Sequence, residues 1–446
     1  MDKFVILGGK KLQGRVKISG AKNVSLPIMA ACLLTREEVC LKDVPPLSDV
    51  HNMMKVLERL GARVYFDNNS LKIKADVIRG EGPPVDLVSK MRASFLTAGA
   101  LLGRRGRVKI SLPGGCSIGR RPIDLHLKGF RALGATTEEA CGYICIRAKA
   151  LRGDRIYLDF PSVGATENLM MAASRALGTT VIENAAEEPE IVDLANFLNA
   201  MGAKISGAGT KVIRIEGVEE LGSAVHTVIP DRIEAGTFMV AAAITRSRII
   251  LDNVILDHLK AVAAKLKEAG AELVEQNDGS ILVSGENCSR PLDIKTLPYP
   301  GFPTDMQAQL MALLTLARGR SVVTENIFEN RFMHVAELNR MGADIRVEGS
   351  SAFLTGVKKL QGFPVRSTDL RAGAALVLAG LAARGCTEVL EVKHIDRGYY
   401  HIDEKLRQLG ADIQRVKMEE EEDTAAGEAV EHSETLNLIE NTAAPR

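Results

Sequence analysis

Leu60-Gly61-Ala62 closes an amphipathic stretch, and this helix ending recurs along a chain of 446 residues. Glycine commonly follows the last turn of a helix because it enters the left-handed backbone region without strain. The later copies are Leu133-Gly134-Ala135, Met201-Gly202-Ala203, Ala269-Gly270-Ala271, Met341-Gly342-Ala343 and Leu409-Gly410-Ala411. Successive glycines are 68 to 73 residues apart, which indicates that one structural unit is used six times.

Each unit follows the same order of predicted elements. An apolar helix comes first, then a β-branched strand such as 248–251, then a helix with a charged face such as 257–269, and then a strand such as 411–416. The first helices are apolar nearly all round, so we expect them to be buried. They are predicted at 26–34, 93–102, 168–177, 236–244, 306–316 and 371–382.

The six units divide into two sets of three. We predict a first domain at 22–229 and a second domain that combines 1–21 with 230–418. The first ~20 residues are expected to form an extra strand pair that packs on the second half. Residues 419–446 begin with an acidic run and hold few apolar side chains, so we expect an acidic disordered tail.

The composition excludes several classes of protein. A net charge of +1, 4% aromatic residues and no Trp argue against a nucleic-acid or membrane partner. The apolar runs are too short to span a bilayer, and the N-terminus lacks a signal-peptide hydrophobic region. Seven scattered cysteines without a CxxC pair favour reduced thiols and a cytoplasmic location. No metal-ligand spacing is present, so no metal is expected.

The segment 112–122 cannot form a regular element, because it holds three glycines and two prolines. It places Cys116 near Arg120 and Arg121, and nearby guanidinium groups favour the thiolate form of cysteine. The loop is not a Walker A motif, since no Gly-Lys-Ser/Thr follows. A chance cysteine in a surface loop remains the alternative.

Charged residues stand just ahead of several apolar helices. Lys22 and Asn23 open the first one and are a candidate anion site, or else a solvated lysine beside an N-capping asparagine. Asp305 follows three prolines, so it is either held in place for chemistry or part of an N-cap with Thr304. Arg371 heads the last apolar helix, and a buried charge there is costly unless it is paired or used.

Six separate motifs resemble the UDP-N-acetylglucosamine 1-carboxyvinyltransferase family, the peptidoglycan branch of the enolpyruvyl transferases. The resemblance covers residues 1 to about 417 and leaves out the acidic tail. The motifs lie at 19–23, 113–126, 162–166, 299–305, 329–334 and 394–399. The resemblance implies an α/β fold of two inside-out barrels, each of three repeats with its helices inside.

The resemblance also implies the reaction. Phosphoenolpyruvate and UDP-N-acetylglucosamine would give the 3-O-enolpyruvyl ether and phosphate without a cofactor, as the first committed step of peptidoglycan synthesis. A shikimate-pathway enolpyruvyl transferase and a catalytically inactive paralogue that acts as a regulator are the alternatives. The chain is expected to be a monomer or a weak oligomer.

The same resemblance assigns roles to individual positions. Cys116 would be the general acid and the target of the epoxide fosfomycin, and Asp305 would be the base. Phosphoenolpyruvate would be held by Lys22, Asn23, Arg121, Arg371 and Arg397. UDP-N-acetylglucosamine would be held by Asn23, Arg92, Arg121, Pro122, Ile123, Asp124, Leu125, Ser162, Val163, Gly164, Asp305 and Ile327. The two domains would close on substrate, with the Cys116 loop as a lid.

Overall fold

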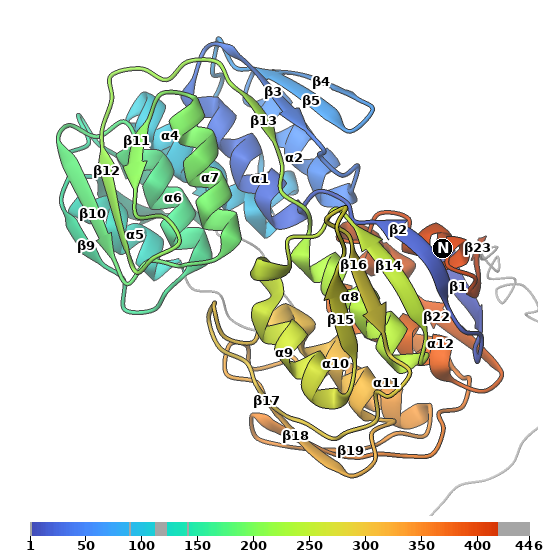
Figure 1. Ribbon diagram of the computed structural model, residues 1–446. Coiled ribbons are helices and arrows are strands. Elements are labelled where there is room, and N and C mark those ends of the chain that lie inside the picture. Colours follow the sequence, from blue (N-terminus) through green and yellow to red (C-terminus); the bar gives the residue numbers. More distant parts are fainter. Residues whose placement is uncertain (1, 89–90, 112–122, 141, 418–446) are drawn as a thin grey trace, which may run out of the picture.

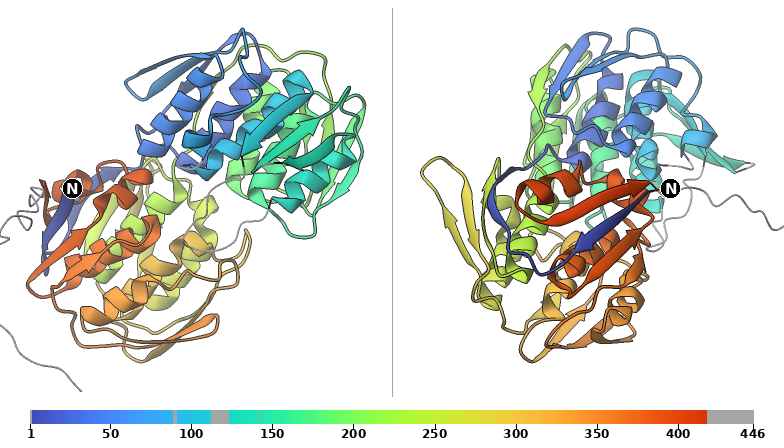
Figure 2. Two further views of the ribbon diagram at one scale, coloured as in Figure 1. Left: turned by 180° about the vertical axis from the view of Figure 1, so that it is seen from behind. Right: turned by 90° about the vertical axis from the view of Figure 1, so that its right-hand side faces the viewer.

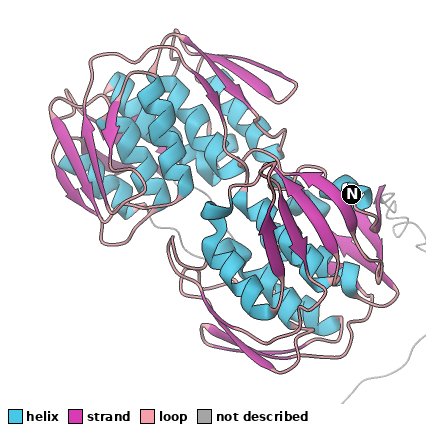
Figure 3. Cartoon of the chain, viewed as in Figure 1, coloured by secondary structure: helices cyan, strands magenta, loops and turns pink. Residues whose placement is uncertain are grey.

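The computed structural model describes residues 2–88, 91–111, 123–140 and 142–417, and Figure 1 shows that they form two lobes. The Cys116 loop, with Arg121 and Pro122, and the tail at 419–446 lie outside the described residues. Figure 3 shows helices gathered inside each lobe and strands along its outside. The predicted α/β fold of two inside-out barrels is confirmed.

The first lobe contains three repeats. Its buried helices are α1 (Lys22–Ala31), α4 (Thr97–Arg105) and α6 (Val163–Ala173), and its outer helices are α2 (Ser48–Arg59), α5 (Asp124–Ala132) and α7 (Pro189–Ala200). A short helix, α3 (Val85–Val88), precedes α4. The strands are β3 (Glu38–Lys42), β4 (Arg63–Asp67), β5 (Ser70–Lys74), β6 (Arg107–Ser111), β7 (Thr136–Ala140), β8 (Tyr143–Arg147), β9 (Arg155–Tyr157), β10 (Thr179–Glu183), β11 (Lys204–Ser206), β12 (Val212–Glu216) and β13 (Val225–Thr227).

The second lobe repeats this plan. Its buried helices are α8 (Arg232–Ile244), α10 (Gln307–Leu314) and α12 (Leu370–Ala382), and its outer helices are α9 (Lys260–Ala269), α11 (His334–Arg340) and α13 (Ile402–Gln408). The strands are β1 (Asp2–Leu7), β2 (Gln13–Lys17), β14 (Arg248–Asp252), β15 (Glu272–Glu275), β16 (Ile281–Ser284), β17 (Asp293–Lys295), β18 (Arg320–Thr324), β19 (Asp344–Glu348), β20 (Ser351–Thr355), β21 (Pro364–Arg366), β22 (Cys386–Leu390) and β23 (Asp412–Lys417).

The repeated glycines end the outer helices as the sequence predicts. Gly61, Gly134, Gly202, Gly270, Gly342 and Gly410 all have positive φ angles, between 87° and 108°. A side chain at these positions would be strained, which is why glycine recurs there. The regular spacing of these glycines is therefore the sequence trace of six equivalent helix ends.

The N-terminal strands correct one expectation. β1 and β2 do not pair with each other. β1 lies between β22 and β23, while β2 pairs in parallel with β14 in a different sheet. Both strands do belong to the second lobe, because β1 supplies the strand that the sixth repeat lacks. The predicted helix at 168–177 also differs, since α6 occupies 163–173.

Each lobe has its own apolar core. One cluster runs from Ala21 to Val228 and contains the buried faces of α1, α4 and α6. The other combines Phe4 to Ile18 with Ile233 to Ile413. The views in Figure 2 show the same two bodies with the N-terminal strand in the second lobe. Among the described residues, no helix is long and apolar enough to cross a bilayer.

The chain crosses between the lobes at two adjacent segments. Ala21 donates its backbone N–H to Ile229 O at 2.8 Å, and Asp231 donates its own to Ser19 O at 2.8 Å. This pairing sets the N-termini of α1 and α8 side by side. Near the crossing, Arg232 Nε lies 2.9 Å from Glu190 Oε1 in a buried ion pair between the lobes. The polar N-termini of buried helices therefore face the junction of the two lobes.

Candidate active site

The N-terminus of α1 carries a buried lysine that is paired. Lys22 is 9% exposed, and its Nζ lies 3.3 Å from Asp49 Oδ2 on α2. The N-cap of α1 is Ala21, so Asn23 does not cap this helix. A solvated lysine beside an N-capping asparagine is thus the wrong interpretation of this segment.

Asp49 joins Lys22 to a residue of the other lobe. Arg397 Nε lies 3.1 Å from Asp49 Oδ1, and Arg397 Nη2 lies 3.5 Å from Asp49 Oδ2. Arg397 follows β22 in the second lobe, whereas Asp49 stands in the first turn of α2 in the first lobe. One 3% exposed carboxylate therefore holds two of the cations that the family resemblance assigns to phosphoenolpyruvate.

A second carboxylate pairs with two arginines. Asp305 precedes α10, and its Oδ1 accepts a hydrogen bond from Arg331 Nη2 at 2.7 Å. Its Oδ2 accepts one from Arg371 Nη2 at 2.9 Å. Both guanidinium groups are nearly buried, at 5% and 4% side-chain exposure. Asp305 makes no capping bond to its helix, so the N-cap alternative is wrong.

The charges around these pairs shift two pKa values in the same direction. Burial lowers the pKa of Lys22, and Arg371 and Arg397 lower it further, against the opposing charges of Asp49 and Asp305. Burial by itself would raise the pKa of Asp305, but Arg371 and Arg331 outweigh it and hold that pKa well below its usual range. Charged side chains from both lobes therefore shift the pKa of Lys22. We treat the ion pairs of Asp49 and those of Asp305 as parts of one candidate site.

Backbone and aromatic contacts hold this cluster in position. Gln309 Nε2 donates to Asp305 O at 2.9 Å and to Tyr399 Oη at 3.1 Å. The Tyr399 hydroxyl also shares a hydrogen bond with Thr237 Oγ1 at 2.9 Å. The Arg371 guanidinium stands over the Tyr399 ring, with its Cζ 5.4 Å from the ring centroid. Three helices of the second lobe thus fix the side chains that face Lys22.

A neutral histidine marks the part of the first lobe that carries the other predicted residues. Asn168 Nδ2 of α6 donates to His126 Nδ1 at 3.0 Å, so Nδ1 is the acceptor. Burial, with the positive charge of Arg92 nearby, lowers the pKa of His126 to about 3. A Cβ built on Gly164 would lie 3.4 Å from the His126 ring. The first turn of α6 and α5 therefore meet at this ring.

The structure places the remaining predicted residues as follows. Ser162 caps α6 by accepting the Ala165 N–H at 3.3 Å, and Val163 begins that helix. Ile123 and Leu125 are partly buried at the start of α5, while Asp124 is exposed there. Ile327 is partly buried after β18 in the second lobe. Cys116, Arg121 and Pro122 lie outside the described residues, so their roles stay predictions.

Three buried charged residues that organise the site have no role among the predictions made from the sequence. Arg331 belongs to a quoted motif, and its buried guanidinium holds Asp305. Asp49 stands in an ordinary amphipathic helix, and its 3% exposure is not readable from the sequence. Glu325 follows β18 and is 4% exposed. Asp49 stands on the apolar face of α2, which was the available signal for it, whereas Arg331 and Glu325 lie outside helices and strands and offered no periodic signal.

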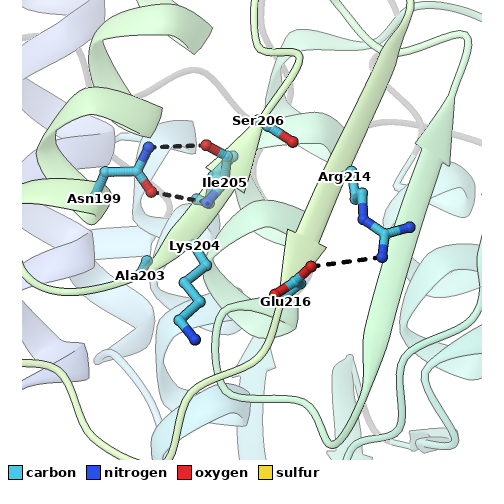
Figure 4. A pocket seen from close by; sticks show the side chains of 7 residues that line it. All are labelled: Asn199, Ala203, Lys204, Ile205, Ser206, Arg214 and Glu216. Carbon is cyan, nitrogen blue, oxygen red and sulfur yellow. Dashed lines mark hydrogen bonds and ion pairs between the residues drawn. The ribbon is translucent and has the colours of Figure 1, made fainter.

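A separate depression lies far from these residues, at the edge of β11 and β12 (Figure 4). It has a volume of about 330 Å³ and is lined by Asn199, Ala203, Lys204, Ile205, Ser206, Arg214 and Glu216. The Asn199 side chain is already bonded to both backbone groups of Ile205, and Arg214 faces Glu216 at 3.5 Å. These polar groups satisfy one another, so this depression is not the candidate active site.

Comparison with known proteins identifies the family of this chain. The family model described as EPSP synthase (3-phosphoshikimate 1-carboxyvinyltransferase) matches residues 6–406. UDP-N-acetylglucosamine 1-carboxyvinyltransferase 2 of Carboxydothermus hydrogenoformans is 63% identical over 417 residues, which cover 93% of this chain and 100% of that protein. The chain belongs to the UDP-N-acetylglucosamine 1-carboxyvinyltransferase family. A family member from Caldanaerobacter subterraneus subsp. tengcongensis is 61% identical over 413 residues, 93% of this chain and 99% of that protein.

Solved structures of related transferases share the architecture of this family member. The enolpyruvyl transferase NikO from Streptomyces tendae matches with a TM-score of 0.84 at 25% identity, over 93% of this chain and 98% of NikO. An EPSP synthase from Acinetobacter baumannii matches with a TM-score of 0.74 at 20% identity, over 94% of this chain and 100% of that chain. The latter likeness concerns the fold alone.

In the described ranges of this family member, no group of three or more His, Cys, Asp or Glu side chains is arranged to hold a metal ion. The residues that the structure gathers are instead two carboxylates with two cations each: Asp305 with Arg331 and Arg371, and Asp49 with Lys22 and Arg397. Such a set suits a small substrate with two anionic groups, because ionised donors make the strongest hydrogen bonds to carboxylate and phosphate.

Proposed function

We propose that this protein transfers the enolpyruvyl group of phosphoenolpyruvate to the 3-hydroxyl of UDP-N-acetylglucosamine and releases phosphate. Two observations carry the proposal. The chain is 63% identical to the whole length of UDP-N-acetylglucosamine 1-carboxyvinyltransferase 2 of Carboxydothermus hydrogenoformans. In addition, the charges of Asp305, Arg371 and Arg397 all act on the buried amine of Lys22. This reaction is the first committed step of peptidoglycan synthesis. A cytoplasmic location and a monomeric or weakly associating chain stay predictions.

The cations suit the donor substrate. Phosphoenolpyruvate carries a phosphate and a carboxylate, and Lys22 and Arg397 come from opposite lobes to the same carboxylate of Asp49. An incoming anion can displace the Asp49 carboxylate from these two cations, or it can bind the cations together with that carboxylate. Because both lobes contribute, binding of the donor favours the arrangement in which the lobes are close together.

The reaction consists of an addition and an elimination, with three proton transfers. The oxygen of the sugar 3-hydroxyl bonds to C2 of phosphoenolpyruvate while its proton leaves and C3 gains a proton. C3 then loses a proton, and the C2–O bond to phosphate breaks. Cys116 is the proposed donor of the proton to C3, on the strength of the family resemblance and its position beside Arg120 and Arg121.

Asp305 is the proposed acceptor of the hydroxyl proton. Its carboxylate stays ionised at neutral pH, because two guanidinium groups hold its pKa well below the usual range. The same pairs fix its orientation, so it can direct the acceptor hydroxyl toward C2. Since those pairs also reduce its basicity, orientation of the hydroxyl is the larger part of its proposed contribution.

Phosphate release tests the proposed function. The purified chain is incubated with phosphoenolpyruvate and either UDP-N-acetylglucosamine or shikimate 3-phosphate, and phosphate is measured over time. We expect turnover with the sugar nucleotide and a large excess over shikimate 3-phosphate. Equal or greater turnover with shikimate 3-phosphate would make this protein a shikimate-pathway enzyme. Turnover with neither acceptor would favour the inactive, regulatory alternative.

Ligand binding gives a second measurement of acceptor choice. A ligand that binds the native state raises thermal stability by mass action, so UDP-N-acetylglucosamine should raise the melting temperature. Shikimate 3-phosphate serves as the control and should leave it unchanged. A chain that is stabilised only by shikimate 3-phosphate would contradict the proposal.

A further inference from the structure

Glu325 is a buried carboxylate that binds four donors at the end of β18. Its Oε1 accepts hydrogen bonds from Thr296 Oγ1 at 2.9 Å, from the Ile327 N–H at 2.8 Å and from the Phe328 N–H at 3.2 Å. Its Oε2 accepts one from Thr304 Oγ1 at 2.9 Å. A carboxylate that is 4% exposed is costly to bury, and these bonds are the compensation that the fold provides.

A series of hydrogen bonds connects Oε2 of this carboxylate to Asp305. Thr304 Oγ1 uses its single proton to bond Glu325, so its lone pairs are left to accept from Arg331 Nη1 at 3.1 Å. Arg331 Nη2 then donates to Asp305 Oδ1 at 2.7 Å. Glu325, Thr304 and Arg331 thus form a chain of hydrogen bonds that sets the direction of the Asp305 carboxylate.

The other side of this carboxylate shapes the turn that carries Ile327. Oε1 collects two successive backbone N–H groups, and the adjacent Asn326 N–H donates to Thr296 Oγ1 at 2.9 Å. Three consecutive backbone groups are therefore fixed, directly or through Thr296, by one side chain. Ile327 is among the positions proposed for the acceptor nucleotide, so this turn is part of the acceptor site.

We propose that Glu325 is a positioning residue that couples the Ile327 turn, which holds the acceptor, to the orientation of Asp305, which receives the acceptor's proton. The inference rests on the proposed function. Glu325 touches neither substrate nor reacting atoms. It acts through Thr304 and Arg331 on one side and through backbone N–H groups on the other. Binding of the acceptor nucleotide and orientation of its hydroxyl then depend on the same carboxylate.

Two substitutions separate the two sides. Thr304→Val keeps the side-chain shape but removes the hydroxyl, so Arg331 Nη1 loses an acceptor and Glu325 Oε2 loses a donor. The bonds that Glu325 Oε1 accepts at the Ile327 turn keep their partners. We expect kcat to fall roughly tenfold, with the KM for UDP-N-acetylglucosamine within about twofold of the unchanged chain. Glu325→Gln disturbs both sides, because its single amide oxygen can serve only one of them and, being uncharged, accepts more weakly than a carboxylate oxygen. We expect kcat to fall at least as far and this KM to rise roughly tenfold.

Matched variants control the experiment. Thr304→Ser keeps the hydroxyl and should restore kcat to within about threefold of the unchanged chain. Thr324→Val removes a hydroxyl one residue from Glu325 that, among the described residues, bonds across the sheet to Ser351 Oγ at 3.0 Å, and kcat and KM should not change. Melting temperatures are measured for all four. If Glu325→Gln fails to fold, the Thr304→Val and Thr304→Ser pair decides the question.

The possible results are distinct. An active unchanged chain whose Thr304→Val and Glu325→Gln variants keep kcat and KM overturns the inference and leaves the proposed function standing. A Thr304→Val variant that raises KM alone, with kcat intact, also overturns it. An unchanged chain without turnover on phosphoenolpyruvate and UDP-N-acetylglucosamine overturns the proposed function and this inference together.

Discussion

Arg397 Nε of the second lobe lies 3.1 Å from Asp49 Oδ1 of the first, although the two residues are 348 positions apart in the chain. The same carboxylate accepts a hydrogen bond from Lys22 Nζ at 3.3 Å. Asp49 therefore acts as an internal anion between the two cations proposed to bind phosphoenolpyruvate. Burial lowers the pKa of Lys22, and the charge of Asp49 opposes this effect.

Asp49→Asn should make Lys22 lose its proton at lower pH. Burial, Arg371 and Arg397 already lower the pKa of Lys22, and Asp49 is the first opposing influence. The protonated amine binds the anion, so activity is present below this pKa and is lost as the pH rises through it. We expect the alkaline limb of kcat/KM for phosphoenolpyruvate to move at least about one pH unit lower. Asp67→Asn, at an exposed aspartate, is the control.

If the alkaline limb of kcat/KM lies at the same pH in Asp49→Asn and in the unchanged chain, Asp49 does not influence the pKa of Lys22. The phosphate-release assay measured across the alkaline range gives this comparison directly.

Asp305→Asn should abolish most activity and also destabilise the fold. It leaves the buried guanidinium groups of Arg331 and Arg371 without their counter-charge. We expect kcat to fall by at least about 100-fold, the usual range for a positioned proton acceptor. The carboxylate pKa is held well below its usual range, so its stabilising effect is present above pH ~4 and is lost only as the pH falls through the lowered value.

The pH dependence of the Asp305 effect can be measured by thermal unfolding. The melting-temperature difference between Asp305→Asn and the unchanged chain should persist from neutral pH down to about pH 4 and shrink at lower pH. Asp344→Asn, at an exposed aspartate of β19, is the matched control. A difference that disappears already near pH 6 would contradict the role of the two arginines.

Cys116 should be the thiol that fosfomycin modifies. Burial raises the pKa of Cys288 to about 11 and raises that of Cys32 further, so both thiols stay protonated and unreactive. Cys116 precedes Arg120 and Arg121 by four and five residues in the sequence, and we expect their guanidinium groups to favour its thiolate. Mass mapping after treatment should place the adduct on Cys116, and UDP-N-acetylglucosamine should speed its formation.

Two variants check the role of this thiol. Cys116→Ser should remove labelling and most of the activity, because a hydroxyl is a far weaker acid than a thiol. Cys116→Asp can retain activity without labelling, since a carboxyl group donates a proton. An adduct on Cys386, which is exposed, or full activity in Cys116→Ala would remove Cys116 from the proposed mechanism.

Deletion of residues 419–446 should leave the melting temperature and kcat nearly unchanged. The segment begins with an acidic run and has too few apolar side chains to join either core. The two clusters that form those cores end at Val228 and Ile413. A melting temperature several degrees lower in the truncated chain would show that the tail docks on the folded part.

The repeats were predictable from the sequence because their signals are local. A glycine after an amphipathic helix reports one backbone conformation, and six copies at regular spacing report six equivalent units. The structure confirms positive φ angles at all six, including Gly61 and Gly410. Lys22, Asp305 and Arg371 could also be singled out in advance, because each stands just ahead of an apolar helix, and the family resemblance added Arg397.

Only the tertiary structure decided how these residues pair. The sequence did not place β1 and β2 in separate sheets, because strand pairing depends on which edges the rest of the chain leaves open. Neither did it join Asp49 to Arg397, nor Arg331 to Asp305. Periodicity and helix ends depend on neighbours a few residues away, whereas an ion pair depends on where two distant segments come to rest. The six-unit architecture was therefore determined by the sequence pattern, and the charge pairing at the site by tertiary packing within each lobe and between the two lobes.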